Sequence, residues 1–354
     1  MSEKFVENGD ISLWVEDFGD ASNQTVLLIR GIGGSGVAWN VSFCEILAAS
    51  GYHVIRYDQR DSGLSSFVNY RRNPYRLADL AKDAICILDS YGVKKAHIVG
   101  MSMGGFISQL LTIQFPHRIK TLTLLSTTLD FRPQLLAGLG IGTAWLRLPG
   151  PKRKTVRDLK SIRNLKALKV IKSIASRPTP IDPVGYESRE ARQYVEIAKV
   201  CNGEKTPFDP AEYAELRNAI YEHRSSHGKL TATSNFINHG RAIRKGPIHI
   251  HSERIRRPTM VIHGSRDPII PVKHARALAR IIPNAKRIII YGMGHVISKH
   301  YFDDIITGAL LHFWGDPFSA EFTLNYDKKK ETRISHFLHK LPRKFWHKRQ
   351  VKVE

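Results

Sequence analysis

Cysteine and long apolar runs are both scarce in this sequence, and each scarcity excludes a class of protein. The 354 residues include only three cysteines, Cys44, Cys86 and Cys201. Their odd number and wide spacing support neither a disulfide framework nor a cysteine-based zinc site. No apolar run reaches about 18 residues, and the first residues, MSEKFVENGD, lack the apolar core of a signal peptide. We therefore expect no membrane span and a reducing, cytoplasmic setting.

Acidic residues are also scarce, but the resulting positive charge is concentrated in two places. The chain has 54 Lys and Arg against 32 Asp and Glu, which gives a net charge of +22. Residues 152–173 contribute +8 of this charge and residues 327–354 contribute +7. The rest of the chain is only mildly basic. No nucleic-acid recognition motif is visible, so nucleic acid is not expected as a partner.

The two basic segments differ in their apolar pattern. In residues 156–171 apolar residues recur at every third position, so an apolar stripe would wind around a helix. We interpret this segment as a solvated surface or as an electropositive rim that attracts anionic substrates or a membrane. Ile334–Trp346 instead combines helical apolar spacing with basic residues and an aromatic end. Such a stretch can lie on an anionic membrane or dock on the protein body, and both hypotheses stay open.

Strand-like and helix-like patterns alternate along most of the chain. Short apolar strands separated by amphipathic helices are typical of a parallel sheet that is covered on both faces. The alternation stops near residue 129 and returns at Thr259, so residues 129–250 are interpreted as a mainly helical insertion. The expected strands are Lys4–Val6, Ile11–Phe18, Thr25–Ile29, His53–Tyr57, Ala96–Val99, Thr121–Leu125, Thr259–His263 and Lys286–Tyr291. The expected helices are Val37–Ser50, Tyr75–Tyr91, Met103–Gln114, Val272–Ile282 and Lys299–Trp314.

A glycine-rich run follows the strand at Thr25–Ile29 and raises the question of a nucleotide cofactor. Gly31, Gly33 and Gly36 have the spacing G-x-G-x-x-G, and Asp58 ends the next strand. This arrangement is close to the fingerprint of dinucleotide-binding proteins, in which glycines approach a pyrophosphate and the acid binds a ribose. A dinucleotide-dependent oxidoreductase is therefore one hypothesis.

A second motif, Gly100-Met101-Ser102-Met103-Gly104, lies between a strand and a helix. This G-x-S-x-G pattern predicts a sharp turn that exposes the hydroxyl of Ser102, because Gly100 and Gly104 let neighbouring backbone pass closely. The amide N–H of Met103 would then lie at a helix N-terminus, where it can stabilise an anion. Ser102 is the candidate nucleophile.

A serine nucleophile needs a base and an acid that orients the base. His295 follows the last expected strand in GMGH, and Asp267 follows the strand before it in HGSRDP. The order Ser102, Asp267, His295 is the order found in α/β-hydrolases. Asp130, which follows the sixth strand, is the alternative candidate for the acid.

With these motifs in view, the chain resembles the α/β-hydrolases, and among them the aclacinomycin methylesterase-like carboxylesterases. The resemblance covers about residues 5–315 and rests on five stretches: YDQRDSG (57–63), RNPY (72–75), AHIVGMSMGG (96–105), TPFDPAEY (206–213) and GMGH (292–295). It implies an α/β-hydrolase fold: a mostly parallel eight-stranded sheet with helices on both faces and a helical cap inserted after strand six. The implied domains are a core (1–128 and 251–316), a cap (129–250) and a basic tail (317–354).

The resemblance also implies the chemistry. Ser102, Asp267 and His295 would form a catalytic triad that cleaves a small-molecule carboxylic ester without a cofactor or metal. The backbone N–H groups of Ile32 and Met103 would form the oxyanion hole. Thioester, perhydrolase and C–C bond chemistry on the same triad stay open, as does a ligand-binding protein with little or no turnover. Epoxide hydrolase and haloalkane dehalogenase chemistry is disfavoured, because it needs an aspartate where Ser102 stands.

Two further features of the sequence concern the loop beside the nucleophile and a possible metal site. Hydrolases of this fold often have His-Gly where this chain has Arg30-Gly31. Arg30 is expected to form an internal ion pair, with an anionic group of the substrate as the alternative. His249 and His251 form an H-x-H pair, but further ligands at metal-binding spacing are lacking, so no metal is expected. The oligomeric state is not indicated.

Overall fold

One large sheet organises the molecule, in the order β1-β2-β4-β3-β5-β6-β7-β8-β9. The computed structural model describes residues 2–129, 189–203, 206–225, 235–245, 250–315 and 321–324. Strand β2 pairs antiparallel with β1 and with β4, and every other neighbouring pair is parallel. The strands are β1 (Ser2–Asn8), β2 (Ile11–Phe18), β3 (Gln24–Ile29), β4 (Tyr52–Tyr57), β5 (Ala96–Met101), β6 (Ile119–Leu125), β7 (Thr259–Gly264), β8 (Lys286–Ile290) and β9 (Glu321–Leu324). The eight predicted strands are confirmed, and β9 adds a ninth within the predicted tail.

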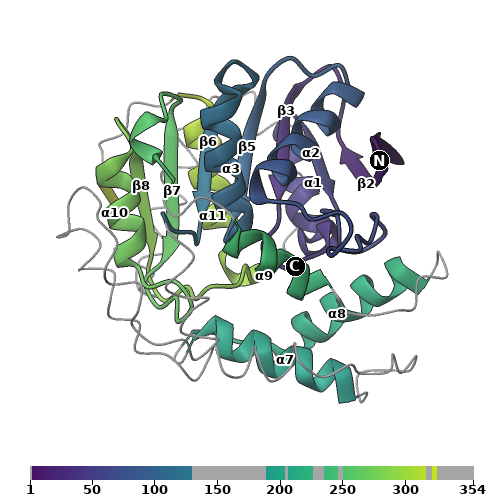
Figure 1. Cartoon of the computed structure of the whole chain (residues 1–354). Coiled ribbons are helices and arrows are strands. Elements are labelled where there is room, and N and C mark those ends of the chain that lie inside the picture. Colours follow the sequence, from purple (N-terminus) through teal and green to yellow (C-terminus); the bar gives the residue numbers. More distant parts are fainter. Residues whose placement is uncertain are drawn as a thin grey trace, which may run out of the picture.

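Helices cover both faces of the sheet, as the near-continuous apolar strands require. Successive strand residues alternate between two cores: Leu27 and Ile98 belong to one, Val26 and Val99 to the other. The first core includes side chains of α2 (Leu77–Ser90), α3 (Met103–Gln114) and α10 (Lys273–Ile281), and the second includes side chains of α1 (Val41–Ala49) and α11 (Phe302–Phe313) (Figure 1). The core therefore consists of two apolar layers, one on each side of the sheet.

Four predicted helices, α1, α2, α10 and α11, begin later than expected, and two of them follow a 3-10 turn. The region from Val37 starts with a short 3-10 turn, Gly36–Ala38, and α1 begins only at Val41. The cause is Asn40, whose side chain accepts a hydrogen bond from the Ser42 N–H and so caps the helix. A second 3-10 turn, Lys299–Tyr301, likewise precedes α11.

Between β6 and β7 the described residues form helices α7 (Arg189–Asn202), α8 (Pro210–Ser225) and α9 (Asn235–Arg244). Figure 1 shows α7 and α8 below the sheet in this view, at one end of the strands. The predicted helical insertion after the sixth strand is present in these residues. The basic segment 152–173 and the amphipathic segment Ile334–Trp346 lie outside the described residues. No helix in the described ranges is long and apolar enough to cross a membrane.

Candidate active site

Ser102 occupies a strained turn between β5 and α3. Its φ of 54° is unusual for a residue other than glycine. Close backbone contact on both sides explains the two flanking glycines: a methyl group at Gly100 would lie 2.5 Å from the Gly104 carbonyl oxygen, and one at Gly104 would overlap the Ile29 carbonyl oxygen. The Ser102 carbonyl oxygen accepts a hydrogen bond from Thr127 Oγ1 at 2.6 Å. The turn is therefore fixed by packing and hydrogen bonding.

The structure brings the three predicted triad residues into one hydrogen-bonded chain. Ser102 Oγ lies 3.2 Å from His295 Nε2, and His295 Nδ1 lies 2.8 Å from Asp267 Oδ2. All three are almost fully buried. With Asp267 ionised, Nδ1–H donates to the carboxylate and leaves Nε2 to accept the Ser102 proton. The chain has the geometry of a nucleophile, a base and an orienting acid.

Asp267 is itself held by its own loop. Its Oδ1 accepts hydrogen bonds from the N–H groups of Ile269, at 2.9 Å, and Ile270, at 2.7 Å. His263 lies nearby, with Nε2 2.7 Å from the Ile270 carbonyl oxygen and 3.4 Å from Asp267 Oδ2. Burial lowers the pKa of His263 against the opposing charge of Asp267, so His263 is neutral. A neutral His263 does not cancel the charge of Asp267, which stays available to His295.

The predicted oxyanion residues flank the nucleophile. Gly31 packs against Ser102, because a methyl group at Gly31 would lie 3.1 Å from Ser102 Cβ. Ile32 follows Gly31, and Met103 is the first residue of α3. Neither the Ile32 nor the Met103 N–H donates a hydrogen bond to another residue that the structure describes. The predicted oxyanion role requires amides that are not engaged in this way.

His239, on α9, was not anticipated from the sequence and fixes the loop that carries Ile32. Its Nδ1 accepts from the Gly33 N–H at 2.9 Å, and its Nε2 lies 2.9 Å from the Arg60 carbonyl oxygen. Burial lowers the pKa of His239, so the ring is neutral and has one acceptor and one donor for these two partners. The pair Gly33 and His239 is separated by 206 residues. No local pattern could have identified this contact.

Asp58, the acid of the glycine-rich fingerprint, uses both carboxylate oxygens in hydrogen bonds within the protein and has none left for a ribose. Asp58 Oδ1 accepts hydrogen bonds from Ser35 Oγ and the Gly36 N–H, both at 2.6 Å. Its Oδ2 accepts from the Leu64 N–H and lies 2.8 Å from His223 Nε2. Burial alone would raise the pKa of Asp58, but the hydrogen bond and charge of His223, with those neighbours, lower it. Asp58 joins two loops, and the dinucleotide hypothesis loses its ribose ligand.

Helix α7 contacts the histidine loop directly. The His295 N–H donates to the Cys201 carbonyl oxygen at 2.9 Å. A methyl group at Gly294 would overlap the Asn202 carbonyl oxygen, and Thr206 Oγ1 donates to the Gly292 carbonyl oxygen. The glycines of GMGH therefore allow the inserted region to pack against the loop of the base.

Arg30 lacks the internal ion pair that was expected. Its Nη1 contacts Met101 Sδ at 2.8 Å, and its guanidinium lies 5.5 Å from the centre of the Trp39 ring. No carboxylate among the described residues pairs with it. The alternative, an anionic group of the substrate, becomes the interpretation to pursue.

Other predicted candidates are not brought to this site. Asp130 and His249 lie outside the described residues, and His251 is exposed, with its Nδ1 2.9 Å from Glu253 Oε1. Within the described ranges no three His, Cys, Asp or Glu side chains are grouped so that they could hold a metal ion.

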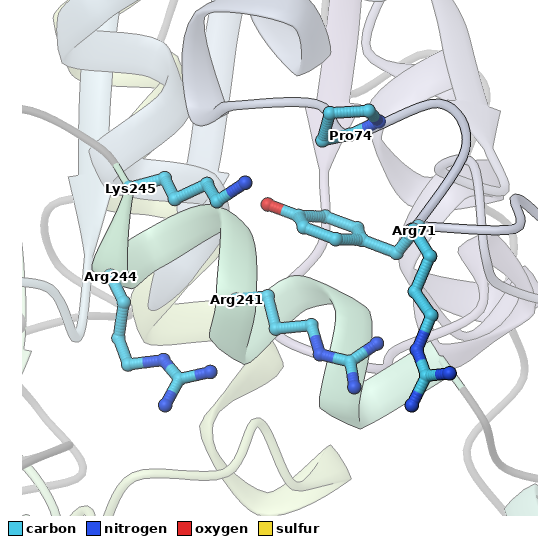
Figure 2. A pocket seen from close by; sticks show the side chains of 6 residues that line it. Arg71, Pro74, Arg241, Arg244 and Lys245 are labelled. Carbon is cyan, nitrogen blue, oxygen red and sulfur yellow. The ribbon is translucent and has the colours of Figure 1, made fainter.

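A cationic cavity of about 460 Å³ lies apart from the triad. It contains none of the three triad residues, and Figure 2 labels four of its cationic side chains. Of these, Arg241 lies 5.6 Å and Lys245 lies 5.3 Å from the centre of the Tyr70 ring. The cationic side chains come from the loop before α2 and from the end of α9. The lining residues are Tyr70, Arg71, Pro74, Arg241, Arg244 and Lys245.

Comparisons with known proteins agree with this geometry. Residues 24–299 match the family model described as alpha/beta hydrolase fold. The chain is 33% identical over 317 residues to rhodomycin D methylesterase DauP of Streptomyces sp. (strain C5), covering 88% of this chain and 98% of the relative. Identity to rhodomycin D methylesterase DnrP of Streptomyces peucetius is 32%, with the same coverage. A hydrolase of Pseudomonas aeruginosa PA01 has a TM-score of 0.58 and 26% identity, over 88% of this chain and 98% of that one.

Proposed function

Because this chain belongs to the α/β-hydrolase fold family, we propose that it is a carboxylic ester hydrolase that works through an acyl-enzyme. One observation carries the proposal: the hydrogen-bonded chain from Ser102 through His295 to Asp267. The same residues would support a thioesterase or another acyl transfer. The methylesterase relatives favour the ester, since they match nearly the full length of both chains.

The proposed reaction has two steps. Ser102 Oγ attacks the ester carbonyl carbon while His295 Nε2 takes the hydroxyl proton, and Asp267 stabilises the resulting imidazolium. The intermediate collapses, His295 returns the proton to the leaving alkoxide, and the alcohol departs. A water molecule, deprotonated by His295, then attacks the acyl-enzyme. The bond from the acyl carbon to Ser102 Oγ breaks, His295 returns the proton to Oγ, and the acid departs. The Ile32 and Met103 N–H groups stabilise the oxyanion in both steps, each contributing about 10²–10³ in rate.

Methyl esters of carboxylic acids are the proposed substrate class. Both relatives are named rhodomycin D methylesterase, and their matches cover most of the chain. A panel of methyl esters with acyl groups of increasing size, beside p-nitrophenyl esters, would define the acyl preference. A matching thioester in the same panel tests the alternative acyl transfer.

Ser102→Ala tests the nucleophile. We expect hydrolysis of p-nitrophenyl acetate and labelling by a fluorophosphonate probe to be lost, while the circular dichroism spectrum is unchanged. Ser42→Ala, at an exposed serine of α1 outside the triad, is the control and should keep both activities. Turnover near the unmodified rate in Ser102→Ala would exclude the proposed nucleophile. Absence of labelling in the unmodified protein would favour a non-catalytic ligand-binding role.

Peripheral association with an anionic membrane through Ile334–Trp346 is proposed separately. Replacing Arg343, Lys344 and Lys348 by Gln removes three cations that would each contribute about 1 kcal/mol near such a surface. Binding to phosphatidylserine liposomes should then fall about 100-fold in a sedimentation assay. Replacing Lys152, Arg153 and Lys154 in the same way tests the other basic segment. Equal binding by all three proteins would reject the membrane role.

A further inference from the structure

Arg30 places a partly buried positive charge beside the nucleophile turn, without an acidic partner among the described residues. Its two neighbours, the Met101 thioether at 2.8 Å and the Trp39 ring at 5.5 Å, are a weak acceptor and an aromatic face. The residue is only half-buried, so solvent or a ligand can contact it. A partly dehydrated guanidinium is stabilised most by a carboxylate or phosphate, which neither neighbour supplies.

A hydroxyl of the inserted helices lies near the same charge and also lacks a partner. Tyr213 follows Glu212 on α8, and Glu212 lines a small cavity together with Trp39, the ring next to Arg30. Burial lowers the pKa of Arg30, and Tyr194 on α7 and Tyr213 on α8 oppose that shift. The Tyr213 hydroxyl is buried and makes no hydrogen bond to a described residue. A buried donor left without an acceptor is costly to the fold. Two groups suited to an anion, one cation and one hydroxyl, therefore lie in the same region.

The location connects these groups to the reaction. Gly31, next to Arg30, packs against Ser102, and Met101, which Arg30 contacts, immediately precedes Ser102. An anion bound by Arg30 would thus belong to the molecule whose ester carbonyl lies at Ser102, or would compete with it.

We propose that Arg30 and Tyr213 form a subsite for a free carboxylate of the ester substrate. The substrate would then be a monoester of a dicarboxylic acid, with the carboxylate a few bonds from the ester carbonyl. Arg30 binds the carboxylate through two N–H groups, and Tyr213 donates its hydroxyl to the same group. This inference rests on the proposed esterase function and specifies its substrate class.

Selectivity between an anionic ester and a neutral ester of the same shape tests the subsite. Monomethyl glutarate and methyl 5-oxohexanoate differ mainly in a carboxylate against a methyl ketone. Arg30→Met should lower the ratio of their kcat/KM values about 10- to 100-fold, and Tyr213→Phe should lower it about 5-fold. Arg30→Lys, which keeps the charge but loses the planar fork, should give an intermediate ratio. Arg280→Met, on an exposed cation of α10, removes the same net charge and should leave the ratio unchanged.

A binding measurement separates this inference from the proposed function. In the Ser102→Ala background, isothermal titration calorimetry should detect binding of monomethyl glutarate that Arg30→Met weakens at least 10-fold. If monomethyl glutarate binds in an Arg30-dependent way but the unmodified protein hydrolyses no ester, the subsite proposal stands and the proposed esterase function is rejected. An unchanged selectivity ratio in Arg30→Met, with equal losses on both esters, would overturn the subsite and show that Arg30 only supports the loop.

Discussion

Asp267→Asn is expected to reduce kcat about 10⁴-fold and to leave the fold intact. The reason is the asymmetry of the carboxylate. Oδ1 accepts two backbone N–H groups, so the amide oxygen of asparagine keeps that position and its NH₂ group faces His295 Nδ1. Nδ1 must then accept, the ring proton moves to Nε2, and Nε2 can no longer accept from Ser102 Oγ.

Initial rates with p-nitrophenyl acetate, with kcat and KM determined separately, measure this effect, and circular dichroism checks the fold. Asp130→Asn is the matched control, because Asp130 is the other acid that the sequence offers. It should keep kcat within about 2-fold, since it does not belong to the hydrogen-bonded chain proposed here. A loss below 10-fold for Asp267→Asn, or a 10⁴-fold loss for Asp130→Asn, would refute the assignment of the orienting acid.

Two further predictions concern packing and charge. Gly104→Ala should lower kcat at least 100-fold and shift the urea midpoint downward, because its methyl group would overlap the Ile29 carbonyl oxygen; a midpoint equal to that of the unmodified protein would contradict this. Burial, and to a smaller extent the charge of Asp303, raises the pKa of Asp304 to about 6. The folded protein therefore binds the Asp304 proton more tightly than the unfolded chain does. Ionisation of Asp304 as the pH rises from about 4 to 6 then lowers the stability of the fold. In urea titrations, Asp304→Asn should therefore raise the free energy of unfolding by about 1–2 kcal/mol at pH 7.5, after allowance for solvent screening, and should change it little at pH 4. Asp303→Asn, at an exposed position, should change the free energy of unfolding by less than about 0.5 kcal/mol. Equal effects of the two variants would contradict the burial argument.

The parts of the fold that local physics determines could be predicted from the sequence. Periodicity located the eight strands, and the spacing of Gly100 and Gly104 around Ser102 predicted a turn that a larger side chain would block. The order of the strands then predicted that Asp267 and His295 lie in the loops after the last two predicted strands. Each of these inferences depends on residues that are close along the chain.

Features that depend on distant contacts were missed. His239 binds the loop at Gly33 only because α9 folds back onto it. The neighbours of Arg30, Met101 and Trp39, are likewise brought to it by the fold. The strand β9 is four residues long and pairs with the edge of an existing sheet, so its own sequence has little periodicity to detect. The domain boundaries and the roles of the two basic segments stay predictions.

The hydrogen bond from the His295 N–H to the Cys201 carbonyl oxygen has a consequence for protein engineering. Substrate range in an enzyme of this architecture is an attractive target for exchange of the inserted region between relatives. Here the inserted region also supplies a backbone acceptor to the loop of the proposed base. A chimera that changes the path of α7 would alter the position of that base together with the pocket. Exchanges that retain residues 201–206 should therefore preserve turnover better than exchanges of the whole insertion.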